Sequence, residues 1–235
     1  MAEVILVVSG QPSRQERLTA AAQRLGTLSG QGRVRMLAFG PPTDALPAPD
    51  MPGEHLPDGA DVAAIVEARG SRADFIVIAR PAPEDDRATR DAFRAALFRT
   101  DRPLLMMPPD GPADTFGVRV AVAWRDDPQT LKALVPALRL LGHTEEVLLL
   151  AGVRAGSASP TIPSVLIEHG LPASLHVLAI DSSPFGDLLL GRARDLGADM
   201  LIMGAYAHSP LREMLLGGVT RHVLAHAGLP VLMRH

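Results

Sequence analysis

The sequence predicts an α/β protein built from two unequal copies of one βα domain. Short runs rich in valine, isoleucine and leucine recur along the 235 residues, are bounded by glycine, proline or aspartate, and are separated by stretches long enough for helices. Such runs are typical of strands buried on both faces of a parallel sheet. The nine expected strands are residues 4–8, 34–39, 75–79, 103–107, 118–124, 147–151, 175–180, 200–204 and 230–233.

Three of these strands occur twice, in the same order, which indicates duplication. Proline, glycine and aspartate cluster in residues 108–117, so the boundary between domains 1–112 and 113–235 is expected there. The matched segments are Glu3-Val-Ile-Leu-Val-Val with Arg119-Val-Ala-Val-Ala-Trp, Ala73-Asp-Phe-Ile-Val-Ile-Ala with Ala198-Asp-Met-Leu-Ile-Met-Gly, and Arg102-Pro-Leu-Leu-Met with Leu229-Pro-Val-Leu-Met.

The first copy is expected to be degenerate. Residues 145–180 of the second copy leave room for a strand, a loop, a helix and another strand, whereas the first copy has the proline-rich stretch 41–57 and no obvious third strand. Proline cannot donate to a sheet ladder, so this stretch is predicted to be a surface loop with a short edge segment near residues 54–56.

Composition excludes several classes of function. The chain has 23 basic and 26 acidic residues, a net charge of −3, so no basic surface for nucleic acid or anionic membrane is expected. It has no cysteine, which excludes disulfides and thiol nucleophiles and fits a reducing compartment. The first apolar run, residues 4–8, is too short for a signal peptide or a membrane span. We therefore expect a cytoplasmic protein.

The segment 203–224 carries the strongest indication of a ligand site, because it follows an expected strand and ends in an expected helix. Backbone N–H groups at a helix N-terminus lack intrahelical partners and bind anions, and glycines let the chain approach a phosphate closely. Gly217 and Gly218 are expected to open the helix, with the Thr220 hydroxyl facing the ligand. The candidate binding residues are Met203, Gly204, Ala207, His208, Gly217, Gly218, Val219 and Thr220.

This segment resembles the nucleotide motif of the universal stress protein family, Gly-x2-Gly-x9-Gly-[Ser/Thr], followed by a hydrophobic helix and a last strand with Pro-Val-Leu. Gly204 and Gly217 match the first and third glycines, while Ala207 replaces the second and Gly218 replaces the Ser/Thr. The resemblance covers residues 118–235 and, more faintly, 3–107. It implies two tandem doubly wound, mostly parallel five-stranded sheets, adenine nucleotide alpha hydrolase-like in fold. It also implies ATP or another adenine nucleotide as a ligand of the C-terminal domain only.

Departures from the family pattern keep two hypotheses open for this site. An acidic residue usually ends the first strand of ATP-binding members and faces the adenine, but Arg125 stands there, followed by Asp126 and Asp127. Gly218 lacks the hydroxyl that would hold a phosphate. The chain is therefore either a nucleotide-binding member or an interaction module of the same fold that has lost the nucleotide.

The first copy is not expected to bind nucleotide. Its equivalent segment, residues 78–87, has no glycine, two prolines without N–H groups, and three carboxylates where phosphates would lie: Glu84, Asp85 and Asp86. These carboxylates should repel a phosphate.

Other candidate residues have competing interpretations. Asp126 and Asp127 could form an acid/base or Mg²⁺ pair, but Asp127 followed by Pro128 favours a helix N-cap. His222 and His226 share a helix face at i and i+4, yet no glutamate lies between them, so no metal site is predicted.

Four residues near the expected site also remain open between ligand contact and ordinary packing or solvation. Trp124 and Tyr206 could stack on a base or pack at strand ends, and His208 and Arg212 could touch phosphates or be solvated.

The sequence thus predicts a nonenzymatic stress-response binding or signalling module. No catalytic residue is assigned, since a slow ATP hydrolase, the further alternative, would need a Walker lysine, a metal pair and a general base that are not evident. The two halves are expected to pack as an intramolecular pseudo-dimer, with their last strands meeting as the resemblance suggests. A homodimer of chains is compatible with this arrangement.

Overall fold

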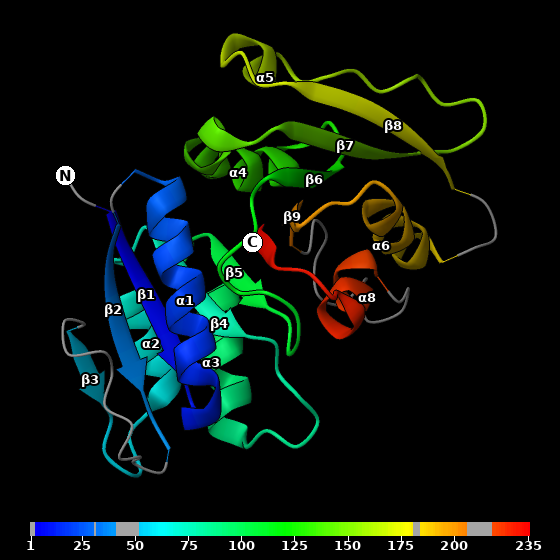
Figure 1. The fold of residues 1–235 in the computed structure, drawn as a ribbon. Helices are drawn as coiled ribbons and strands as arrows, with labels where there is room; N and C mark the ends of the chain where they lie inside the picture. The colour runs from blue at the N-terminus through cyan, green and yellow to red at the C-terminus, as the bar shows by residue number, and fades with distance from the viewer. Residues whose placement is uncertain (1–2, 31, 41–51, 181–183, 206–217) are drawn as a thin grey trace. The chain divides into compact units, whose positions relative to one another are not determined.

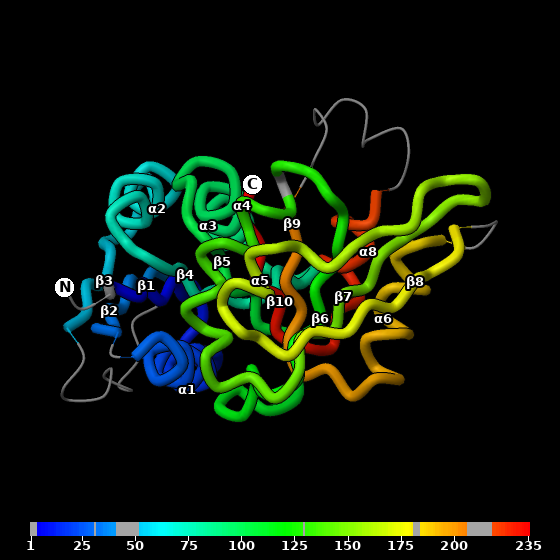
Figure 2. The backbone as a smooth tube through the Cα atoms, turned by 90° about the horizontal axis from the view of Figure 1, so that it is seen from above, coloured from blue at the N-terminus to red at the C-terminus, as the bar shows by residue number. Residues whose placement is uncertain are grey.

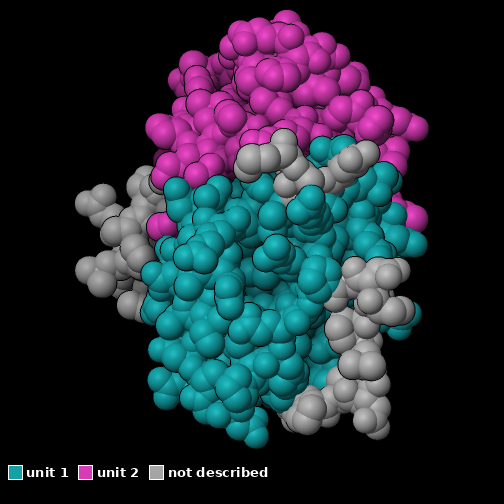
Figure 3. Space-filling view, turned by 90° about the vertical axis from the view of Figure 1, so that its left-hand side faces the viewer, with its two compact units in different colours: residues 1–114 teal, residues 115–235 magenta. Residues whose placement is uncertain are grey.

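The computed structural model describes residues 3–30, 32–40, 52–180, 184–205 and 218–235. The chain divides into two compact units, residues 1–114 and 115–235, which Figure 3 shows in two colours. This division lies within the segment 108–117, where proline, glycine and aspartate cluster.

Unit 1 is a parallel five-stranded sheet with strand order β3-β2-β1-β4-β5. In Figures 1 and 2, α1 covers one face of this sheet, and α2 and α3 cover the other. Its elements are β1 (Glu3–Ser9), α1 (Pro12–Leu28), β2 (Gly32–Ala38), β3 (Gly53–His55), α2 (Val62–Gly70), β4 (Phe75–Ala79), α3 (Arg87–Phe98) and β5 (Leu104–Met107).

Unit 2 repeats this topology, with parallel strands in the order β8-β7-β6-β9-β10. Helix α4 packs on β9 and β10, whereas α6 packs on β7 and α8. The elements are β6 (Arg119–Trp124), α4 (Pro128–Ala137), a 3-10 helix (Leu138–His143), β7 (Glu146–Val153), α5 (Ser164–Glu168), β8 (Ala173–Ala179), α6 (Phe185–Asp195), β9 (Met200–Gly204), α8 (Val219–His226) and β10 (Val231–Arg234). The predicted α/β fold is therefore confirmed, and both units connect their strands in the same order.

All nine expected strands are present, and β3 is a tenth in the place where only an edge segment was predicted. Strand β3 pairs with β2 from Met36 opposite Gly53 to Ala38 opposite His55. All three residues of β3, Gly-Glu-His, are exposed, and none of them belongs to an apolar run that would indicate a strand. The short edge segment expected near residues 54–56 is therefore present as β3, a strand held by backbone pairing and by the buried Leu56 that follows it.

The repeated Ala-Asp pair has the same role in both units. The Asp74 carboxylate accepts a hydrogen bond of 2.8 Å from the N–H of Val4, where β1 begins. The Asp199 carboxylate accepts from the N–H groups of Gly117, Val118 and Arg119 at 2.8, 2.9 and 3.2 Å. In each unit an aspartate before the fourth strand thus fixes the start of the central strand, which gives a physical reason for the repeat.

Among the described helices, none combines the length and the apolar character that crossing a bilayer requires.

Candidate functional site

The topology of unit 2 places its candidate site at the carboxyl ends of β6 and β9. These two strands are neighbours in the middle of the sheet, and the chain order reverses between them. Open parallel sheets bind their ligands at such a switch point, outside the carboxyl ends of the strands. Strand β6 ends here at Trp124 and β9 ends at Gly204.

Helix α8 begins without a side-chain cap from the described residues. Its N-cap is Gly218, and the first hydrogen bond of the helix runs from the His222 N–H to the Gly218 carbonyl at 3.2 Å. The N–H groups of Val219, Thr220 and Arg221 therefore precede the helical hydrogen-bond ladder. Within the described part of the chain, no side chain caps this end, and no acidic residue lies in the first turn.

Three other helices, α2, α3 and α4, differ from α8 because an aspartate side chain caps the N-terminus of each. Asp61, Asp86 and Asp127 accept hydrogen bonds from the N–H groups of Ala64, Thr89 and Thr130 at 3.1, 2.7 and 2.8 Å. An internal anion at those helix ends occupies the position that a ligand anion would need.

The structure describes five of the eight predicted site residues. Gly204 is the last residue of β9 and Gly218 is the N-cap of α8, as expected, while Val219 is half-buried and Thr220 is buried. Met203 is a buried strand residue opposite Met233 of β10. The predicted site residues Ala207, His208 and Gly217 lie outside the described residues. The further candidates Tyr206 and Arg212 lie outside them as well.

Trp124 is a core residue at the end of β6. Its side chain is buried and its indole N–H donates to the Thr161 carbonyl at 3.0 Å. The structure therefore supports packing, rather than stacking on a base, as the role of this residue.

Asp127 is the N-cap of α4, with Pro128 at the first helical position, as predicted. Its carboxylate also bonds the Arg125 guanidinium. Burial is the largest influence on the pKa of Asp127 and raises it, but hydrogen bonds from the Thr130 N–H, Arg125 and the Thr130 hydroxyl together hold the pKa below its ordinary value. A carboxylate engaged in this way keeps its charge at neutral pH and is a structural cap.

His222 and His226 contact neighbouring side chains of helices α6 and α8. The His222 Nε2 lies 3.1 Å from an Asp187 carboxylate oxygen of α6, and the two imidazole rings stack with centroids 4.3 Å apart. A methyl group at Gly186 would lie 2.6 Å from the His222 ring, so this glycine allows α6 and α8 to approach. Among the described residues, no group of three metal-binding side chains is found.

Sequence reasoning missed a polar network on β7 and β8. The Ser174 hydroxyl donates to the Glu146 carboxylate at 2.8 Å and lies 3.0 Å from the His176 Nε2. Glu146 also pairs with Arg119 at 2.8 Å. The two-residue spacing of Ser174 and His176, which places both on one face of a strand, could have revealed it. A nucleophilic triad has its histidine between the serine and the acid, whereas here the serine lies between the two. The network therefore does not activate the serine.

Comparison with known proteins agrees with the geometry of unit 2. The family model described as "Universal stress protein family" matches residues 176–235, a segment that contains β9, α8 and β10. Residues 176–235, about a quarter of the chain, are therefore similar to the universal stress protein family. This segment includes both the switch-point strand β9 and helix α8.

Solved structures share the fold of this chain over almost its whole length. A universal stress protein from Archaeoglobus fulgidus DSM 4304 superimposes with a TM-score of 0.72 at 14% identity, covering 98% of this chain and 95% of that one. A putative universal stress protein from Pseudomonas aeruginosa UCBPP-PA14 gives a TM-score of 0.61 at 16% identity, covering 99% and 93%. At these identities the likeness is one of fold. The chain matches no curated protein sequence.

Proposed function

We propose that this chain is a universal stress protein, a nonenzymatic, cytoplasmic stress-response module whose second unit binds ATP or another adenine nucleotide. The observation that carries the proposal is the N-terminus of α8, which no side chain of the described residues caps, in the segment that matches the family model and next in the described chain after the switch-point strand β9. The phosphates are the part of the nucleotide that this helix end would hold.

The chemistry of the helix end favours an anion. The aligned peptide dipoles place a partial positive charge of roughly half an elementary charge at a helix N-terminus. The N–H groups of Val219 and Arg221, which precede the helical hydrogen-bond ladder, are donors from which a phosphate oxygen can accept. The first turn of α8 itself carries no acidic side chain, so no carboxylate of this turn offsets the charge.

Recognition of the base is expected to be weak. The residue after β6 is Arg125, which is exposed and bonds Asp127, so no carboxylate at that position faces an adenine. Gly218 contributes no hydroxyl to the phosphates. A hydrogen bond to a charged group contributes about 1.5–3 kcal/mol, so the affinity should be roughly tenfold to a hundredfold lower than with a serine there.

A second candidate function follows from the same residues. The ion pair between Arg125 and Asp127 pairs two charges just after the carboxyl end of β6, which is compatible with a domain that has lost the nucleotide and binds a protein instead. The first function requires the chain to bind a nucleotide, and the second does not.

Isothermal titration of the full chain with ATP separates these functions. We expect saturable heat at one site per chain, competition by inorganic tripolyphosphate, and little heat from adenosine, because the phosphates provide most of the contacts. Absence of heat from ATP and tripolyphosphate would reject nucleotide binding and favour the interaction module.

A further inference from the structure

Unit 1 has a cavity at its own switch point, which we call the unit 1 cavity. It lies at the carboxyl ends of β1 and β4, the neighbouring strands between which the order of unit 1 reverses. About 10 Å³ of it is accessible to the centre of a water molecule, which is room for about one water. Its lining comes from the end of β1, the start of α1, the end of β4, α3 and Phe39.

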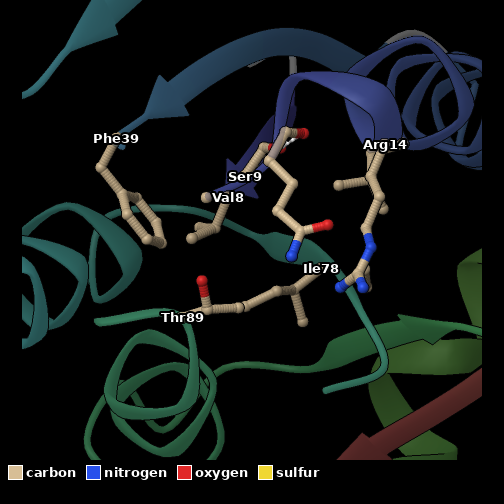
Figure 4. Close-up of a pocket in the computed structure, with 10 residues that line it drawn as sticks. Val8, Ser9, Arg14, Phe39, Ile78 and Thr89 are labelled. Atoms are coloured by element: carbon tan, nitrogen blue, oxygen red, sulfur yellow. Dashed lines mark hydrogen bonds between the residues drawn. The ribbon is translucent and has the colours of Figure 1, made fainter. Parts of the chain in front are cut away.

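Side chains of unit 1 fill the place that a ligand would take. Figure 4 shows Phe39 and Thr89 reaching into this space from opposite sides. A methyl group at Gly10 would lie 2.5 Å from the Phe39 ring and 2.5 Å from the Thr89 hydroxyl, so Phe39 contacts the backbone of the β1–α1 turn directly. This close approach requires a glycine at position 10.

An internal carboxylate lies beside this cavity. The Asp85 side chain is 0% exposed, although a buried carboxylate is costly unless it is fully hydrogen-bonded. One of its oxygens accepts from the Gln11 amide at 2.6 Å, and the other accepts from the Arg14 guanidinium at 3.0 Å and the Ala82 N–H at 2.8 Å. All three donors therefore converge on one buried anion.

The donors come from two elements that are far apart in sequence. Gln11 is the N-cap residue of α1 and Arg14 lies in its first turn, about seventy residues before Asp85. The Gln11 side chain does not cap α1; its amide is directed to Asp85 instead. This end of α1 is thus organised around an anion supplied by the loop between β4 and α3.

We propose that unit 1 carries a small-anion site, formed by Gln11, Arg14 and the Ala82 N–H, which the chain occupies with its own Asp85 carboxylate. The expectation from sequence was that the carboxylates of this loop repel a phosphate. The structure gives Asp85 a different role, since it replaces the anionic group of a ligand. Removing this carboxylate should expose a site for a carboxylate of the same size.

The test is chemical rescue of Asp85→Ala by formate, the ion that corresponds to the carboxylate this substitution removes. The melting temperature of the variant should fall by on the order of 10 °C, because removing one partner of a buried ion pair leaves the other charge unpaired. Formate should raise it again in proportion to the logarithm of its concentration, as a bound ligand does, relative to chloride at equal ionic strength.

Asp61→Ala is the matched control, because Asp61 is an exposed carboxylate of unit 1 that caps α2 by accepting from the Ala64 N–H. Wild type and this control should show no formate-specific gain. Equal melting temperatures of D85A in formate and in chloride would overturn the proposal. Should D85A not fold in chloride, refolding from urea in formate should recover it, and equal failure in both salts would also overturn the proposal.

Discussion

Replacing Asp199 by alanine is expected to lower the free energy of unfolding of unit 2 by about 3 kcal/mol. Each hydrogen bond to a carboxylate contributes about 1.5–3 kcal/mol. Asp199 accepts from the N–H groups of three consecutive residues, Gly117, Val118 and Arg119, at the start of the central strand. We expect less than the simple sum because Asp199 is only half-buried, so water can replace part of what is lost.

Urea denaturation followed by tryptophan fluorescence measures this effect in the full chain. Trp124 is the only tryptophan and is buried in unit 2, so its signal reports the unfolding of that unit. Asp195→Ala is the control, because Asp195 is exposed in the last turn of α6. If D199A and D195A unfolded at the same urea concentration, Asp199 would not hold the start of β6.

Replacing Gly218 by serine is expected to raise the affinity for ATP by roughly tenfold to a hundredfold, since a hydroxyl bonded to a phosphate contributes about 1.5–3 kcal/mol. Gly218 has φ −59°, which serine adopts without strain, and serine is favoured at a helix N-cap. Replacing Gly218 by aspartate should have the opposite effect, because its carboxylate would cap α8 and repel the phosphates.

Titration calorimetry of both variants with ATP measures these changes directly. Gly142→Ser and Gly142→Asp are matched controls, because Gly142 is exposed in the 3-10 helix of unit 2 and a methyl group there would contact nothing within 4 Å. Both controls should bind ATP as the wild type does. An aspartate at position 218 that left the affinity unchanged would place the phosphates elsewhere.

The strands of this protein are predictable from sequence because they are buried on both faces. The runs at 75–79 and 200–204 match β4 and β9 residue for residue, since apolar content alone defines a strand in the middle of a parallel sheet. The Asp127 cap was predictable for a similar reason: aspartate followed by proline has a local and specific role at a helix start.

Features that depend on distant partners were not predictable in this way. Strand β3 is exposed and is defined by its pairing with β2, so its own sequence carries no signal. The role of Asp85 depends on Gln11 and Arg14, which lie about seventy residues away in sequence. In the sequence, nothing distinguishes Asp85 from the two carboxylates on either side of it. The sequence is compatible with either base stacking or packing for Trp124, and only its hydrogen bond to the Thr161 carbonyl favours packing.

The most direct test of the central claim is to map backbone amide chemical shifts of the isotope-labelled chain during titration with ATP. Binding by phosphates at the start of α8 predicts that the largest shifts occur at Gly218, Val219 and Thr220, with a smaller response at Gly204. Amides beside the filled unit 1 cavity, such as that of Gly10, should not move. Shifts confined to unit 1, or no shifts at the start of α8, would contradict the account.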